Sequence, residues 1–403
     1  MKIGILRETR IPPDNRAPLS PDQCRLIEDE FPGAHLIVQP SSDRCFKDSA
    51  YRQQGIQIQE NLDECDVLLG IKEVDPGMLV PQKTYMFFSH TIKKQDHNKG
   101  LLKTALDRQI RLIDYETLTD SKGIRIVGFG RWAGLVGTYN GLRAMSIRMG
   151  LREIPLPQDC NGLDKMMKQA SSVKLPSLRI AMTGDGRVAG GSEEMLNAFG
   201  IQKVTVEDYL ARRNFDTPVY VQLDPEKYNR HKAGKTFDLY HFFNNPGEYE
   251  SNFSRFCNKT DILIMAAYWD PAAPVLFTAD QAAYEHFTIK VIADITCDLN
   301  GSVPSTLRTT TFQHPYYDYN PYTGKDEDAF SRDANITVMA INNLPNGLPV
   351  EASMDFGHNL IKNVLPYLLY GDNESIIARA TIADGGKLTA DYHYLADWVS
   401  EPD

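Results

Sequence analysis

The sequence lacks the features that would point to a membrane, an oxidising compartment or nucleic acid. Its six cysteines form no C-x-x-C pair, and no group of His and Cys residues has the spacing of a zinc site. No apolar run is long enough to cross a bilayer, and the first residues do not have the pattern of a signal peptide. Basic tracts are also missing: 43 Lys and Arg stand against 53 Asp and Glu, a net charge of −10, which disfavours phosphate backbones as partners. We expect a cytoplasmic protein with reduced thiols that binds no metal, no nucleic acid and no membrane.

At 403 residues, of which 42% are hydrophobic and 24% charged, the chain has the composition of a globular protein and is too long for one ordinary core. Short apolar runs alternate with helical patterns, which predicts parallel sheets with helices on both faces. In the first half, strands are expected at residues 2–7, 35–39, 67–71, 85–88 and 111–114. A second series is expected at residues 178–183, 204–206, 261–265, 289–293 and 336–340. We therefore predict an α/β protein with two doubly wound units.

The segments between and after these strands complete the predicted organisation. A Gly- and Ala-rich helix over residues 133–150 is expected to connect the units, and residues 214–250, rich in Asn, Tyr, His and Lys, to form an insertion in the second unit. Ser20 and Pro21 are expected as the N-cap and the first residue of a helix. After Pro349 the pattern is helical only, so we expect a terminal helical segment that packs back on one of the sheets.

A glycine-rich stretch over residues 178–192 is the strongest functional pattern in the chain. An apolar strand leads into Gly184 and Gly186, and Gly190 and Gly191 follow as a helix begins, an order typical of dinucleotide-binding turns. Gly184 would permit the tight turn, and Gly186 would let the backbone approach a pyrophosphate. Gly190 or Gly191 would let the helix pack closely on the strand.

The residues that follow the turn fit the same interpretation. The start of the helix, where Arg187 lies, would offer N–H donors and a partial positive charge to phosphates. Glu207 and Asp208 end the next predicted strand, where ribose hydroxyls would be bound. The spacing departs from G-x-G-x-x-G, and a glycine-rich turn without a ligand is the alternative.

Polar residues that follow predicted strands of the first unit are candidates for chemistry, because ligands of open parallel sheets bind at the carboxyl ends of the strands. Lys72 comes directly after the third predicted strand, where partial burial would lower its pKa and suit it to proton transfer. His90 ends the fourth strand and belongs to the residue type that titrates near neutrality. Three arginines, Arg10, Arg16 and Arg125, would bind carboxylates bidentately, which favours an acidic substrate. For each of these residues the alternative is a solvated or structural side chain.

Two strand ends of the second unit carry further polar groups. Asp294 and Asp298 lie at and just after one strand end, and Asn342 follows the last strand. Both ends would face the same crevice as the glycine turn, with solvated loop residues as the alternative. Cys297 lies between the two carboxylates, but no clear base lies nearby, so a small buried residue is expected there rather than a reactive thiol.

These residues belong to a longer series of motifs that resembles a known family. The motifs, in chain order, are Arg16-Ala-Pro-Leu-Ser-Pro21, Val38-Gln-Pro-Ser41, Phe87-Phe-Ser-His-Thr91, Asp114-Tyr-Glu116, Phe129-Gly-Arg-Trp-Ala-Gly134, Asp294-Ile-Thr-Cys-Asp298 and Met339-Ala-Ile-Asn-Asn-Leu-Pro345. The chain resembles the L-lysine-forming saccharopine dehydrogenases, and most nearly the lysine–ketoglutarate reductase module of bifunctional lysine-degrading enzymes. It is more distantly similar to alanine dehydrogenase and the transhydrogenase domain.

The resemblance implies two doubly wound, Rossmann-like domains separated by a cleft, with the C-terminal helices packed back on the N-terminal domain. Residues 1–135 with 346–403 would form the substrate and catalytic domain, and residues 136–345 the dinucleotide-binding domain. The implied reaction is the reversible condensation of L-lysine with 2-oxoglutarate to saccharopine, with reduction by NAD(P)H.

The resemblance also implies roles for individual residues. The family's catalytic lysine falls on Lys72 and its catalytic histidine on His90, and Glu116 matches an acidic residue beside that lysine. Arg16 matches an arginine that binds a substrate carboxylate, and Arg125 matches one close to the nicotinamide.

Some residues depart from the family pattern and keep alternatives open. Asn342 stands where the family often has Asp, and Val350 where it often has Arg. Asn342 is closer to the alanine dehydrogenase pattern, so reductive amination of a simple 2-oxo acid is an alternative, as is a nucleotide-sensing homologue without turnover. Glu207 and Asp208 would repel a 2′-phosphate, which favours NAD(H), although modules that use NADP(H) can also carry an acid nearby. The oligomeric state stays open between monomer and homodimer.

Overall fold

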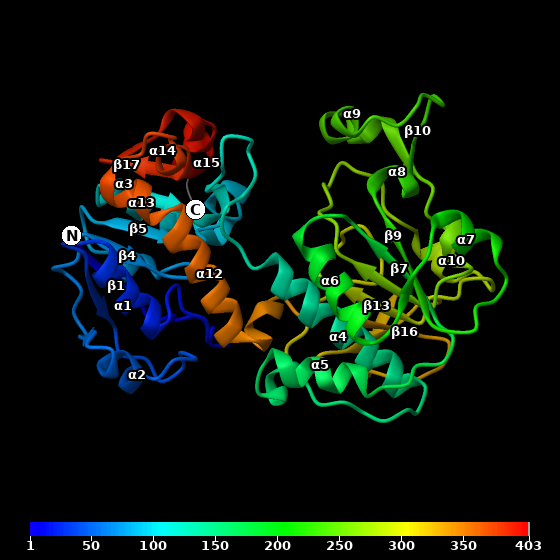
Figure 1. The fold of residues 1–403 in the computed structure, drawn as a ribbon. Coiled ribbons are helices and arrows are strands. Elements are labelled where there is room, and N and C mark those ends of the chain that lie inside the picture. The colour runs from blue at the N-terminus through cyan, green and yellow to red at the C-terminus, as the bar shows by residue number, and fades with distance from the viewer. Residues whose placement is uncertain (402–403) are drawn as a thin grey trace. The chain divides into compact units, whose positions relative to one another are not determined.

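The computed structural model describes residues 1–401, and the chain divides into two compact units, each built on its own sheet (Figure 1). The first unit consists of Met1–Phe129 and the chain from Pro349 onward, and the second of Gly130–Leu348. The predicted α/β class is confirmed. Within residues 1–401, no helix is both long enough and apolar enough to span a membrane.

An eight-stranded sheet forms the first unit, in the order β18-β17-β6-β5-β4-β1-β2-β3. Its parallel strands are β1 (Lys2–Ile5), β2 (His35–Val38), β3 (Gln57–Ile58), β4 (Val67–Leu69), β5 (Thr84–Phe87) and β6 (Arg111–Asp114). The helices between them are α1 (Pro21–Glu30), α2 (Asp48–Gln53) and α3 (Lys99–Asp107). All three residues of β4 are apolar and buried, as expected for a central parallel strand that is covered on both faces.

The start of α1 confirms the predicted cap. Ser20 Oγ accepts the N–H of Gln23, the Gln23 side chain accepts the N–H of Ser20, and Pro21 is the first helical residue. This reciprocal pair satisfies two N–H groups that a helix start would otherwise leave unpaired.

The C-terminal segment contains strands as well as helices, so the prediction of helices alone is wrong. Its helices are α12 (Pro349–Asn363), α13 (Leu365–Tyr370), α14 (Ile376–Ala380) and α15 (Ala396–Ser400). Between the last two, β17 (Thr381–Asp384) pairs antiparallel with β6, and β18 (Lys387–Leu388) pairs with β17. Gly385 and Gly386 make the turn with φ of 54° and 81°, and a Gly pair between short β-prone runs is a hairpin signal.

The second unit contains another eight-stranded sheet, in the order β15-β14-β16-β13-β12-β7-β9-β8. Its strands are β7 (Arg179–Thr183), β8 (Gln202–Lys203), β9 (Val219–Leu223), β12 (Ile262–Met265), β13 (Val291–Asp294), β14 (Tyr317–Asn320), β15 (Lys325–Glu327) and β16 (Ile336–Met339). Among the described strands of this sheet, only β14 is reversed: it pairs antiparallel with both of its neighbours, β16 and β15. Its longer helices are α4 (Gly130–Arg148), α5 (Leu163–Ser171) and α6 (Arg187–Ala198).

Two predictions beside β7 are wrong. The strand expected at residues 204–206 is cut short, because Thr205 caps a helix, α7 (Val206–Ala211), by accepting the N–H of Asp208. The strand that pairs with β7 is instead β9, which lies inside the stretch expected to be an insertion. The true insertion follows β9 and contains α8 (Pro225–Tyr228), β10 (Asn229–His231), α9 (Leu239–Asn244) and β11 (Tyr249–Ser251).

Helices α4 and α6 lie side by side (Figure 1) and meet at two glycines. A Cβ atom on Gly134 would lie 2.0 Å from the carbonyl oxygen of Val188, and one on Gly191 would lie 2.0 Å from that of Arg131. These distances are far below any allowed contact, so the close approach of the two backbones requires glycine at both positions.

Candidate active site

Charged side chains gather where the parallel strands β1, β4 and β5 of the first unit end. Glu8 follows β1, and its buried carboxylate accepts the N–H groups of Ile71 at 2.7 Å and Lys72 at 2.9 Å. Burial and the negative charge of Asp14 raise the pKa of Glu8 to about 7. Glu8 is not among the residues expected from the sequence, where its one signal is its position just after the first strand.

Lys72 lies three residues beyond the end of β4, because the strand ends two residues earlier than expected. Burial lowers the pKa of its ammonium to about 8, and the positive charge of Arg16 adds to this effect. The carboxylates of Asp14 and Glu73 oppose it. A lysine that is partly neutral near physiological pH can accept and return a proton.

His90 lies just beyond the end of β5 and is hydrogen-bonded through Nδ1 to Oε1 of Glu73. The residue adopts a left-handed conformation with φ of 52°, which is uncommon for a residue other than glycine. Burial would raise the pKa of Glu73, but the hydrogen bond and charge of His90 outweigh it and hold that pKa at about 2. An ionised carboxylate on Nδ1 orients the ring and leaves Nε2 for other chemistry.

Arg16 is buried and paired with Asp14. Its Nε and Nη2 donate to the two carboxylate oxygens at 2.9 and 2.6 Å, and its guanidinium lies 4.2 Å from the centre of the Phe129 ring. Although burial would raise the pKa of Asp14, the Arg16 charge holds it at about 2. The pair therefore stays ionised and keeps a rigid cation close enough to act on Lys72.

Glu116, which the resemblance places beside Lys72, forms ion pairs with two other cations. Its Oε1 pairs with Nη2 of Arg125 at 3.0 Å and with Nζ of Lys93 at 3.4 Å. These two cations lower the pKa of Glu116 against the effect of burial, and His90 contributes as well. Arg10 pairs with Glu73 at 3.4 Å and is half exposed. Glu73, which the sequence places next to Lys72, is thus the acid that joins the lysine and histidine segments.

A cavity of about 330 Å³ adjoins this group and is lined by Glu8, Thr9, Lys72 and Glu73, among others. It opens where β1 and β4 end, so a small molecule can reach the lysine. Because the ends of parallel strands are the usual ligand positions of such sheets, the cavity supports a substrate site in the first unit.

In the second unit, β7 leads directly into the predicted glycine turn. Gly184 has φ of 99°, its N–H donates to Leu223 O at 2.8 Å, and a Cβ there would lie 2.8 Å from Ala266 O. Gly186 is the N-cap of α6, brings no side chain to the helix start, and has open space around it. The turn therefore needs glycine at 184 and leaves room for a ligand at 186, which fits a pyrophosphate at the start of α6.

The other glycines of the motif have a different role from the one predicted. Gly191 contacts the backbone of α4 rather than β7, while a Cβ on Gly190 would have nothing within 4 Å. Arg187 is the first residue of α6 and is exposed, close to the turn. Close packing at Gly191 therefore fixes the helix to its neighbour and not to the strand.

Asp224, and not the predicted pair Glu207 and Asp208, follows the strand next to β7. Glu207 and Asp208 lie in the first turn of α7, where Asp208 pairs with Arg212 at 3.3 Å. Asp224 comes directly after β9, and its Oδ1 is buried without a hydrogen-bond partner. It is the N-cap of α8 but makes no side-chain cap bond. Asp224 is not among the residues expected from the sequence, because β9 lies in the stretch predicted to be an insertion.

The remaining residues predicted in the second unit lie at the ends of β13 and β16. Asp294 is buried and accepts hydrogen bonds from the Thr296 and Thr306 hydroxyls at 2.7 and 2.6 Å, which gives it a structural role. Cys297 donates to backbone carbonyls, and burial raises the pKa of its thiol far above the ordinary value, so it is not a thiolate nucleophile. Asp298 and Asn342 are exposed in the loops that follow.

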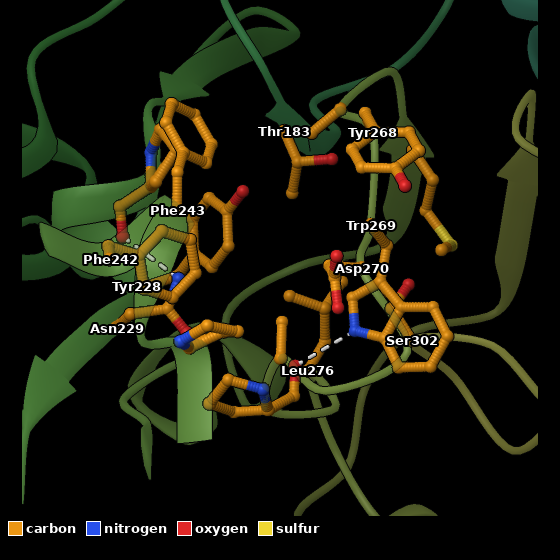
Figure 2. Close-up of a pocket in the computed structure, with 16 residues that line it drawn as sticks. Thr183, Tyr228, Asn229, Phe242, Phe243, Tyr268, Trp269, Asp270, Leu276 and Ser302 are labelled. Atoms are coloured by element: carbon orange, nitrogen blue, oxygen red, sulfur yellow. Dashed lines mark hydrogen bonds between the residues drawn. The ribbon is translucent and has the colours of Figure 1, made fainter. Parts of the chain in front are cut away.

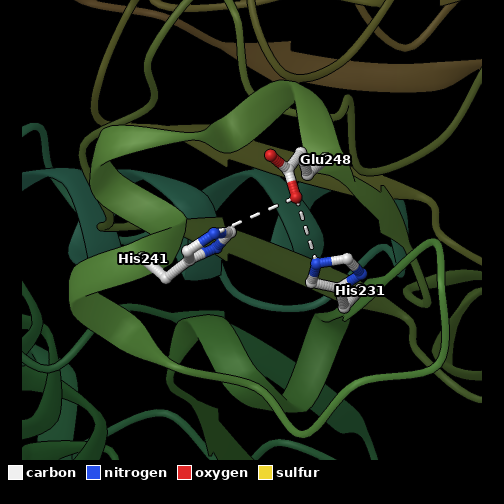
Figure 3. A group of neighbouring side chains, drawn as sticks. All are labelled: His231, His241 and Glu248. Atoms are coloured by element: carbon white, nitrogen blue, oxygen red, sulfur yellow. Dashed lines mark ion pairs between the residues drawn. The ribbon is translucent and has the colours of Figure 1, made fainter.

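Three side chains of the insertion have atoms close enough to suggest a metal site (Figure 3). Glu248 Oε2 lies 3.2 Å from Nε2 of His231 and 3.9 Å from Nε2 of His241. However, the N–H of Ala233 donates to Nδ1 of His231 at 3.0 Å, which leaves the ring proton on Nε2, facing the carboxylate. A protonated nitrogen cannot bind a metal ion. The group instead ties β10, α9 and the start of β11 together.

Two comparisons define the class of this fold. Residues 4–136 match the family Alanine dehydrogenase/PNT, N-terminal domain. The solved structure of an L-alanine dehydrogenase aligns with a TM-score of 0.67 at 16% identity and covers 99% of this chain and 100% of its own. The chain therefore has the Rossmann-like fold of that group.

The homologues of the chain are the saccharopine dehydrogenases (L-lysine-forming) and the alpha-aminoadipic semialdehyde synthases, which confirms the resemblance found in the sequence. The mitochondrial synthase of Bos taurus is 30% identical over 95% of this chain and 46% of its own length. The saccharopine dehydrogenase [NAD(+), L-lysine-forming] of Yarrowia lipolytica is 23% identical over 91% of this chain and 92% of its own. These relatives are enzymes, and the chain spans less than half the length of the synthases.

Proposed function

We propose that the chain is an oxidoreductase acting on a CH–NH group, which interconverts saccharopine with L-lysine and 2-oxoglutarate. The observation that carries the proposal is the joining of a lysine of lowered pKa, Lys72, to a carboxylate-oriented histidine, His90, through the adjacent Glu73. The similarity to a saccharopine dehydrogenase over nearly its full length supports the choice of substrates.

In this mechanism, Lys72 and His90 transfer protons while the carbinolamine forms, loses water and later releases the amine. With a pKa of about 8, Lys72 accepts the proton of a substrate ammonium and returns it. His90, oriented by Glu73, donates to the departing hydroxyl. Arg16, held by Asp14, binds a carboxylate of the 2-oxoglutarate part. A nicotinamide held by the second unit would supply the hydride chemistry that interconverts the imine and the secondary amine.

We propose NAD(H) as the cofactor. Gly184 and Gly186 would hold its pyrophosphate at the start of α6, and Asp224 would accept hydrogen bonds from the adenosine ribose hydroxyls. A carboxylate at that position repels a 2′-phosphate, which disfavours NADP(H). All six cysteines lie in the described part of the chain and are free, which supports the proposed cytoplasmic location.

One residue favours a second candidate. Asn342, in place of Asp, matches the alanine dehydrogenase pattern and would suit reductive amination of a simple 2-oxo acid. The deciding experiment follows the oxidation of NADH and NADPH with 2-oxoglutarate plus L-lysine, and separately with pyruvate plus ammonia. Turnover with the first mixture is expected. Turnover with the second alone would replace the substrate assignment, and NADH binding without turnover in either mixture would indicate a nucleotide-sensing protein.

A further inference from the structure

A cavity of about 220 Å³ lies in the second unit, beside the glycine turn (Figure 2). Thr183, the last residue before the turn, forms part of its lining. One wall comes from the insertion after β9 and the opposite wall from the loop after β12. Its volume is several times the roughly 30 Å³ that one water molecule occupies in the liquid, so it has room for a ring system rather than a single bridging water.

The two walls present aromatic rings that face one another across the space (Figure 2). Tyr228, Phe242 and Phe243 come from the insertion, and Tyr268 and Trp269 from the loop after β12. Phe243 and Tyr268 are 62% and 83% exposed, although both are large apolar rings. Exposed rings on opposite walls of a cavity are the arrangement that stacks a flat heterocycle.

The position of the cavity indicates which heterocycle would bind there. It lies between the carboxyl end of β9, where Asp224 keeps a buried carboxylate oxygen without a partner, and that of β12. A ligand whose phosphates rest on Gly186 and whose ribose reaches Asp224 would have its base at the aromatic walls. The lining of the cavity beside Lys72 contains a single aromatic ring, that of Tyr85, among charged, polar and aliphatic side chains.

We propose that this cavity binds the adenine ring of the dinucleotide, and that the insertion supplies one face of a clamp in which Phe243 and Tyr268 stack on the base. The proposal rests on the proposed function for its cofactor. Contacts within the insertion hold it in shape. His231 and His241 pair with Glu248, and Tyr249 packs edge-on against Phe242 at 5.0 Å between ring centres. Phe243, the stacking residue that the insertion supplies, therefore lies on a helix that these contacts hold in place.

Binding of nucleotide fragments to the full-length apoprotein tests the proposal. Isothermal titration with 5′-AMP and with nicotinamide mononucleotide, together with quenching of Trp269 fluorescence, measures which half of the dinucleotide enters the cavity. We expect 5′-AMP to bind, to quench Trp269 and to compete with NADH. Trp269→Phe assigns the fluorescence signal, since the chain has two other tryptophans.

Two variants test the stacking directly. Phe243→Ala and Tyr268→Ala should each weaken the binding of 5′-AMP and of NADH about tenfold or more, within the range for loss of one aromatic–base stack. Both side chains are largely exposed, so the variants should fold. Tyr240→Ala, on the same helix and 81% exposed but outside the cavity lining, is the matched control and should bind normally.

The outcomes separate this proposal from the proposed function. If NADH binds but both variants bind it and 5′-AMP like the unchanged protein, the clamp is overturned and the dehydrogenase assignment stands. If 5′-AMP binds through the clamp while the protein turns over none of the tested substrates, the clamp stands and the enzyme assignment falls. If neither nucleotide binds, both are overturned.

Discussion

Glu73 Oε1 and His90 Nδ1 share a hydrogen bond, although the two residues are 17 positions apart in the chain. The bond links the ends of β4 and β5, which are neighbours in the first sheet. It therefore orients the histidine from the residue next to Lys72, and makes Glu73 a positioning residue for both proton carriers.

Replacing Glu73 with glutamine should lower kcat/KM for the proposed reaction by up to about a hundredfold, because a misplaced catalytic group costs that much. NADH affinity should not change, since the residue lies in the other unit from the glycine turn. Steady-state kinetics over pH 6–10 together with NADH titration measure both effects. Glu64→Gln, which removes only an exposed pair with Lys2, is the control. Full activity in Glu73→Gln would show that the bond does not position His90.

Lys72→Met should abolish turnover and at the same time stabilise the protein. The folded pKa of about 8 lies below the ordinary lysine pKa of 10.5, so between these values the unfolded chain holds more protons and stability rises with pH. Below pH 8 the buried, charged ammonium lowers the free energy of unfolding, and methionine removes this effect. Urea unfolding at pH 7 and pH 10 should show a gain at pH 7 and a weaker rise with pH in the variant. A loss of stability at both pH values would contradict the burial argument.

The double variant Lys72→Met with His90→Gln tests the proton-transfer assignment itself. We expect NADH to bind as in the unchanged protein and most turnover to disappear, because general acid–base groups contribute roughly 10²–10⁴-fold each to the rate. Near-normal kcat in the double variant would rule out this assignment.

Asp224→Ser should shift the cofactor preference from NADH towards NADPH. Removing the carboxylate removes its repulsion of a 2′-phosphate and its bonds to ribose hydroxyls, so the ratio of Kd for NADH to Kd for NADPH should rise at least about tenfold, as expected for loss of one charged hydrogen-bond partner. Glu207→Gln with Asp208→Asn is the matched control, since these acids lie on α7. If the control shifts the preference and Asp224→Ser does not, the predicted pair binds the ribose after all.

Gly190→Ala and Gly191→Ala should have opposite effects on stability. A methyl group on Gly191 would meet the backbone of α4 at 2.0 Å, so the variant should lose about 1–3 kcal/mol or more. Gly190 has open space, and alanine there should stabilise α6 by about 0.5–1 kcal/mol. Denaturant unfolding of the two variants measures the difference, and equal effects would show that α4 and α6 separate easily.

The sequence predicted well those elements whose signals are local. Apolar runs such as Val67–Leu69 give buried parallel strands, and Lys72 and His90 lie where their strand ends put them. Prediction from the sequence failed for elements whose position depends on the strands that they pair with. Val219–Leu223 has the composition of a strand, with four apolar residues out of five, but its place inside the sheet comes from its pairing with β7.

The same limit applied to the site. Glu73 was adjacent to Lys72 in the sequence, but its bond to His90 depends on the register of β4 against β5 and on the left-handed backbone of His90. Asp224 could be found only after β9 was known. The resemblance places Glu116 beside Lys72, but it did not indicate that Lys93 and Arg125 would pair with its carboxylate.

The pairing of Thr381 with Ile113 has a consequence for biosynthesis. During translation, β6 leaves the ribosome long before its antiparallel neighbour has been made, so one border of the nascent sheet stays open while the whole second unit is synthesised. An open border of this kind recruits other strands. Newly made chains should therefore depend on chaperones until β17 has been made and pairs with β6.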